Sequence, residues 1–138
     1  MPVLRLSETL RNGLLASAQR GYPEEVCGLL LGTRNSTEHV VLAAREARNL
    51  NQERAKDRYE LDPEDFLAAD RDARAAGMDI IGVWHSHPDH PAKPSLTDLA
   101  NAWPRWSYVI VAVGPEGVRD ICSWELHSSD FQEEVIMT

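Results

Sequence analysis

The segment 79–98 constrains the fold and the chemistry of this chain more than any other stretch. It begins with an apolar run at 79–85, bounded by a glycine and a proline, and this pattern predicts a buried strand. Side chains alternate along a strand, so His85 and His87 are expected on one face and Ser86 on the other. Two imidazoles on one face can share a metal ion. The strand therefore predicts a pair of metal-binding histidines.

A short proline-rich loop follows, and then the sequence Ser95-Leu-Thr-Asp98 has the S-x-x-D pattern of a helix start. Taken alone, Ser95 and Asp98 are interpreted as a capping pair. After two histidines, Asp98 has a second interpretation, because a carboxylate held in a first helical turn can fold back over the end of the strand. Two histidines, one carboxylate and a water form a tetrahedral zinc site that keeps one exchangeable position, as catalytic zinc requires.

Other ligand sets compete with this one. Cys27 and Cys122 are the only cysteines, and they lack the paired spacing of a structural zinc site. His90 is the alternative third ligand, although it lies in the proline-rich loop and off the register of the strand. Metal ligands need rigid placement, which favours Asp98.

Hydrolysis at such a site also needs a general acid or base that does not ligate the metal. Glu24 and Glu25 directly precede an apolar, glycine-bounded run at 26–31 that predicts a buried strand. On residue chemistry alone both carboxylates are interpreted as solvated charges at a strand end. Nothing in their spacing brings them to the histidines.

Cysteine and tryptophan side chains invite further functional interpretations. Cys27 has no neighbouring histidine and lies on a predicted buried strand, so it is interpreted as a packed apolar side chain rather than a nucleophile. The tryptophans are irregularly spaced beside apolar segments, and most are expected in the core. Trp103 and Trp106, which follow the predicted ligand helix, are expected at the rim of the site.

These motifs together resemble the JAMM, or MPN-plus, metalloproteases. The resemblance rests on E-V-C-G-L-L-L-G at 25–32, H-S-H at 85–87 and S-x-x-D at 95–98, and it extends over most of the chain. It implies one zinc ion per chain. The matching residues are His85, His87 and Asp98 as zinc ligands, Glu25 as the general base, and Ser95 as the residue that hydrogen-bonds the developing oxyanion.

The short stand-alone form resembles the prokaryotic members that act on ubiquitin-like or sulfur-carrier proteins. It implies a zinc peptidase or isopeptidase that cleaves after a C-terminal Gly-Gly and releases an amino acid or a lysine-linked protein. A Gly-Gly tail has no side chains to grip, so we expect it to bind as an added strand beside a sheet edge near the zinc. Arg54, Lys56 and Arg58 lie in the polar segment 49–58 and are expected to line that groove.

Three other functions stay open. A non-catalytic MPN scaffold would share the fold but lack one or more ligands, and a small-molecule amide hydrolase would use the same site. The RadC-like branch also has H-x-H and S-x-x-D, but with Asn between the histidines and Ser-Gly after the proline. This chain has Ser86 and Asp89-His90 there instead. Zinc content and a substrate panel separate these functions.

With 138 residues, the chain is expected to form one domain over residues 1–138. The order of patterns predicts an α/β fold with a mixed β-sheet flanked by helices, and the resemblance implies the JAMM/MPN, cytidine-deaminase-like fold. Predicted helices cover 7–20 and 62–76, with a third starting at Ser95, and predicted strands cover 26–31, 38–44, 79–85, 108–113 and 118–124.

Charge and hydropathy exclude several partners. The net charge of −8 argues against nucleic acid, because phosphate contacts need a concentrated basic surface. Apolar runs are too short to span a membrane. The N-terminus lacks the long apolar region of a signal peptide, and two cysteines suit a reducing cytoplasm. Beyond Arg119 there is no Lys or Arg, and this acidic end is interpreted as solvated. The sequence makes no prediction of the oligomeric state.

Overall fold

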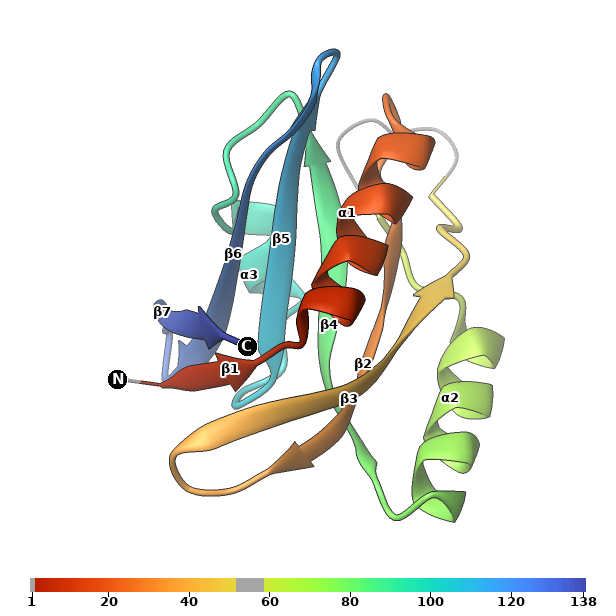
Figure 1. Cartoon of the computed structure of the whole chain (residues 1–138), viewed down its shortest axis with the longest axis vertical. Helices are drawn as coiled ribbons and strands as arrows, with labels where there is room; N and C mark the ends of the chain where they lie inside the picture. The colour runs from red at the N-terminus through yellow and green to blue at the C-terminus, as the bar shows by residue number, and fades with distance from the viewer. Residues whose placement is uncertain (1, 52–58) are drawn as a thin grey trace.

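The computed structural model describes residues 2–51 and 59–138 (Figure 1). In chain order the elements are β1 (Val3–Arg5), α1 (Glu8–Gly21), β2 (Cys27–Arg34), β3 (Glu38–Ala47), α2 (Pro63–Ala75), β4 (Asp79–Pro88), α3 (Leu96–Ala100), β5 (Ser107–Gly114), β6 (Gly117–His127) and β7 (Asp130–Met137). The predicted α/β class with a mixed sheet is confirmed, since β4 and β5 pair in parallel while β2 and β4 pair antiparallel.

The sheet closes on itself in the order β1-β3-β2-β4-β5-β6-β7. Closure depends on β1, which pairs in parallel with β3 on one side and with β7 on the other. The expectation of a free sheet edge beside the histidines is therefore wrong. The histidine strand β4 lies between β2 and β5. Its register with β2 ends at His85, and its register with β5 continues to Pro88.

Local sequence signals explain where both longer helices begin. The Ser7 hydroxyl accepts a hydrogen bond from the N–H of Leu10 at 3.2 Å, as an N-cap does. The Asp62 carboxylate caps α2 in the same way, accepting from the N–H of Glu64 at 2.8 Å, and Pro63 occupies the first turn. Within residues 2–51 and 59–138, no helix has the length and apolarity needed to cross a membrane.

The two helices cover opposite faces of β4. Leu14 and Ala18 of α1 belong to the same buried cluster as Trp84. Ala69 of α2 belongs to a second buried cluster with Val83, the neighbouring residue on the strand. Because side chains alternate along a strand, this arrangement buries both faces and explains the nearly continuous apolar run of β4.

Both ends of the chain form strands that the sequence did not predict. β1 is only three residues long, and the composition of the acidic segment 130–137 indicates a solvated chain end. In the structure this segment is β7, which pairs with β6 and β1 where the two termini meet (Figure 1). Neither strand can be recognised from its own pattern, because each is ordered by partners that are distant in sequence.

Two glycines provide a test of the packing. A methyl group on Gly28 would overlap the carbonyl oxygen of Arg45 and the indole of Trp84, whereas the same position at Gly13 in α1 is open. We expect Gly28→Ala to lower the free energy of unfolding by about 1–3 kcal/mol through overpacking. Gly13→Ala should raise it by about 0.5–1 kcal/mol, because alanine is the better helix former. Urea unfolding of both variants measures the difference, and equal stability would contradict the close approach of β2, β3 and Trp84.

Candidate metal centre

The strand β4 presents both histidines to one buried site. The ring centroids of His85 and His87 are 4.8 Å apart, and the residues are 0% and 7% exposed. Ser86 points elsewhere, because its hydroxyl accepts a hydrogen bond from the N–H of Val26 at 2.9 Å. The predicted alternation along the strand is confirmed.

The register between β2 and β4 brings Glu25 to the histidines. Cys27 lies opposite His85, and the N–H of Ser86 donates to the carbonyl of Val26 at 2.9 Å. The residue before Val26 therefore falls beside the histidine pair. Glu25 is buried, and its Oε1 lies 3.5 Å from Nδ1 of His85.

The short helix α3 supplies a second carboxylate. The Ser95 hydroxyl accepts from the N–H of Asp98 at 3.0 Å, and the N–H of Ser95 donates to Oδ2 of Asp98 at 2.8 Å, so the capping interpretation is confirmed. The same carboxylate also faces the site. Its Oδ2 lies 3.2 Å from Nε2 of His87, and its Oδ1 lies 3.7 Å from Nε2 of His85. Capping therefore fixes the position of a group that faces both imidazoles.

The side chains present fit a divalent cation. Among residues 2–51 and 59–138, neither ring nitrogen of the fully buried His85 has a hydrogen-bond partner, and burying an unpaired polar atom is costly. His87 is oriented by the carbonyl of Pro91, which lies 2.9 Å from Nδ1. A carbonyl only accepts, so Nδ1 carries the proton and Nε2 of the neutral ring is available as a ligand. Ligand atoms of Glu25, His85 and His87 all lie within 4.8 Å of one another.

Protons and a cation compete for this site. Burial acts against ionisation of Asp98, but the hydrogen bond with His87 and the charge of His85 outweigh it and lower the pKa of Asp98 to about 2. Burial also acts against protonation of His87, yet its contacts with Asp98 and Pro91 raise the pKa of this imidazole above its ordinary value. Protonation of His87 removes the lone pair that a cation needs, so metal release is favoured as the pH falls.

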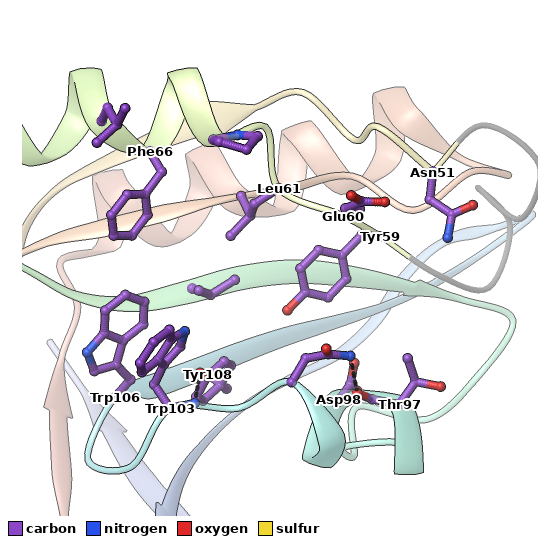
Figure 2. A pocket seen from close by; sticks show the side chains of 14 residues that line it. Asn51, Tyr59, Glu60, Leu61, Phe66, Thr97, Asp98, Trp103, Trp106 and Tyr108 are labelled. Carbon is purple, nitrogen blue, oxygen red and sulfur yellow. Dashed lines mark hydrogen bonds between the residues drawn. The ribbon is translucent and has the colours of Figure 1, made fainter.

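A pocket of about 700 Å³ leads to Asp98 (Figure 2). In Figure 2 the side chains of α2 and of the preceding segment form one wall, and those between Thr97 and Trp106 form the other. Its aromatic lining consists of Tyr59, Phe66, Trp103, Trp106 and Tyr108. Trp103 is 64% exposed, so the prediction that Trp103 and Trp106 lie at the rim agrees with the structure.

Two residues that the sequence reasoning missed support the centre. The ring of Tyr59 stacks on His85 with centroids 4.5 Å apart and planes inclined by 28°. The side-chain amide of Asn49 donates to the carbonyl of Glu25 at 3.1 Å, and its oxygen accepts from the N–H of Glu60 at 2.9 Å. Neither residue carries a recognisable motif, because both act through the tertiary fold.

The other residues considered as ligands, base, nucleophile or groove residues are not part of the centre. Glu24 and His90 are exposed, in contrast to Glu25 and His87. Cys27 is buried, and burial with the nearby Glu25 carboxylate raises the pKa of its thiol to about 12, which agrees with a packed side chain. The predicted groove residues Arg54, Lys56 and Arg58 lie outside the described residues.

Known proteins resemble this chain over most of its length. Residues 7–127 match the family model described as prokaryotic homologs of the JAB domain. A desampylase from Haloferax volcanii is 36% identical over 126 residues, which cover 88% of this chain and 87% of that protein. The CysO-cysteine peptidase of Mycobacterium tuberculosis is 30% identical over 138 residues, covering 97% and 90%. The solution structure of a protein from Desulfitobacterium hafniense superposes with a TM-score of 0.85 at 31% identity, covering 98% of this chain and 92% of that chain.

Proposed function

The chain belongs to the prokaryotic JAB-domain family and is a hydrolase, and we propose that it is a zinc-dependent peptidase or isopeptidase acting after the C-terminal Gly-Gly of a ubiquitin-like or sulfur-carrier protein. The observation that carries this proposal is a buried histidine pair bordered by two carboxylates on different sides. Relatives named desampylase and CysO-cysteine peptidase support the class of substrate.

The two carboxylates are assigned different roles because they face different nitrogens. Asp98 faces Nε2 of both His85 and His87, which supports Asp98 as the third zinc ligand. Glu25 faces Nδ1 of His85, on the other side of that ring. A buried carboxylate next to the ligands but outside their set suits a general base.

When bound, zinc polarises the scissile carbonyl and lowers the pKa of water. In the proposed reaction Glu25 takes a proton from the attacking water and holds it on its carboxylate. It then delivers this proton to the leaving amine nitrogen, which completes the cleavage of the C–N bond. The Ser95 hydroxyl accepts a hydrogen bond from its own helix, so its O–H proton is free to donate to the carbonyl oxygen as negative charge develops there.

The pocket beside Asp98 is the proposed route of the substrate tail. As far as His85, β4 is paired on both sides, so in this proposal the main-chain groups of the tail meet the pocket walls rather than this part of the strand. Tyr59, Glu60 and Leu61 line one wall, and Thr97 and Asn101 contribute to the other. Two glycines fit past such walls because they carry no side chains, while the aromatic part of the pocket can take bulkier neighbouring residues.

A panel of substrates tests the proposal. We expect cleavage after the second glycine of a folded carrier joined to cysteine or to a lysine side chain, in line with the relatives named desampylase and CysO-cysteine peptidase. The matched control is the same conjugate with Gly-Gly replaced by Ala-Ala, which should be cleaved at least ~10-fold more slowly, on the scale of a few added methyl groups in a tight site. Mass spectrometry identifies the cleaved bond.

The same panel separates the alternatives. Equal turnover of unrelated peptides or small acyl amides would favour a general amide hydrolase. A protein that binds zinc but cleaves no member of the panel would favour a scaffold role. Either result would overturn a Gly-Gly-directed enzyme.

A further inference from the structure

A second buried polar cluster lies apart from the histidine pair. It joins three strands: His39 on β3, Glu125 on β6 and Glu134 on β7 are 5%, 5% and 2% exposed. Burying two carboxylates beside one imidazole is unfavourable unless the charges are balanced. We propose that His39, Glu125 and Glu134 bind a divalent transition-metal cation such as Zn²⁺, at a site separate from the catalytic centre.

The spacing of the donor atoms suits a single ion. One ligand atom of each residue lies within 4.8 Å of the other two. His39 Nε2 is 3.7 Å from Oε2 of Glu125, and His39 Nδ1 is 3.7 Å from Oε2 of Glu134. Ligand atoms at zinc bond lengths are about 3.3 Å apart in a tetrahedron, which is close to the 3.7 Å separations in this cluster.

Glu134 supplies an unpartnered donor that points into the cluster. Its Oε1 accepts a hydrogen bond from the Ser123 hydroxyl at 2.8 Å, whereas its fully buried Oε2 has no hydrogen-bond partner among the residues that the structure describes. An ionised oxygen in this position is costly unless a cation meets it. The lone pair of Oε2 is therefore available to a metal ion.

A neighbouring hydroxyl group orients His39. The Ser107 hydroxyl lies 2.6 Å from Nδ1 of His39, which fixes the plane of the ring and leaves Nε2 on the side of Glu125. Outer hydrogen bonds of this kind are typical of metal-ligating histidines. A mixture of imidazole nitrogen and carboxylate oxygen favours first-row transition metals over calcium or magnesium.

The basic side chains near the cluster lie beside Glu125 rather than Glu134. Arg105 and His127 lie 3.5 Å and 2.7 Å from Oε1 of Glu125, at the exposed side of the cluster. In the described part of the chain, Glu134 has only His39 as a basic partner. A bound cation would supply the charge that balances the Glu134 carboxylate in this buried position.

The cluster is open to solvent ions and separate from the catalytic centre. A cavity of about 390 Å³ is lined by all three residues. Ser107 and Val109 share one face of β5, whereas Ile110, the partner of His85 in the register, lies on the other. The two sites therefore lie on opposite faces of the sheet, and a change in one leaves the ligands of the other in place.

Zinc stoichiometry tests the site with the full chain. We expect zinc-saturated, desalted wild-type protein to hold two equivalents per chain, and the His85→Ala/His87→Ala double variant to hold one. Adding Glu134→Gln to the double variant should remove this remaining equivalent. Glu133→Gln is the matched control, because Glu133 is exposed on the other face of β7, and it should leave the stoichiometry unchanged.

Melting temperature and circular dichroism distinguish loss of zinc binding from misfolding in the Glu134 variant. Zinc should raise the melting temperature of the double variant, and adding Glu134→Gln should abolish that shift while the circular dichroism spectrum stays native. A single equivalent in the wild-type protein, or no zinc and no thermal shift in the double variant, would overturn the second site. The cluster would then be a buried network that shares a proton.

Discussion

Replacing His87 or His85 by alanine should lower the zinc content by one equivalent per chain relative to the wild-type protein, and Asp98→Ala should do the same. Hydrolysis of a carrier conjugate should fall by about three orders of magnitude or more, because a metal contributes several kcal/mol of transition-state stabilisation. Asp98 and His87 are 3.2 Å apart within a buried site, so loss of either side chain removes a donor from the set that would hold the ion. Elemental analysis and turnover are measured on the same samples.

Controls separate metal binding from helix capping. Asp98→Ala also removes half of a capping box, which costs about 1 kcal/mol of stability. Ser95→Ala removes the other half at a similar cost in stability, but it should retain zinc while losing activity. His90→Ala should retain both, because His90 is exposed. Full zinc content in the Asp98 variant would refute Asp98 as a ligand.

The second large effect concerns the general base. Glu25→Gln should retain zinc and lower turnover by at least ~10²-fold, the usual contribution of a positioned base. The amide keeps the size of the carboxylate in its buried position beside Nδ1 of His85, but it cannot accept a proton. Glu24→Gln is the matched control, since Glu24 is exposed, and its turnover should stay near that of the wild type.

Glu25 also lies within ligand distance of the histidine pair, so the opposite assignment, with Glu25 as the third ligand and Asp98 as the base, needs its own test. The two sets of variants distinguish the assignments. Loss of zinc in Glu25→Gln together with retention in Asp98→Ala would reverse them. Turnover alone cannot decide, since both variants are expected to be inactive.

Much of the local structure could be predicted from the chain alone. The alternation along β4 placed His85 and His87 together, and the S-x-x-D pattern correctly placed a capped helix at Ser95. These signals are short-range, because they depend on backbone period and on hydrogen bonds within one turn. The α/β class follows from the same patterns. The short strand β1 and the acidic strand β7, however, cannot be predicted from their local sequence.

What the sequence by itself determined is therefore the set of chemical groups and their local arrangement: two histidines on one face and a carboxylate fixed in a first helical turn. Only the tertiary structure decided which other groups join them. The β2–β4 register brought Glu25 to His85 while leaving Glu24 exposed, and the fold stacked Tyr59 on the same ring. Closure of the sheet removed the expected free edge and buried His39 with two glutamates. Such contacts depend on the packing of strands far apart in the chain, and packing leaves no periodic pattern in the residues that it brings together.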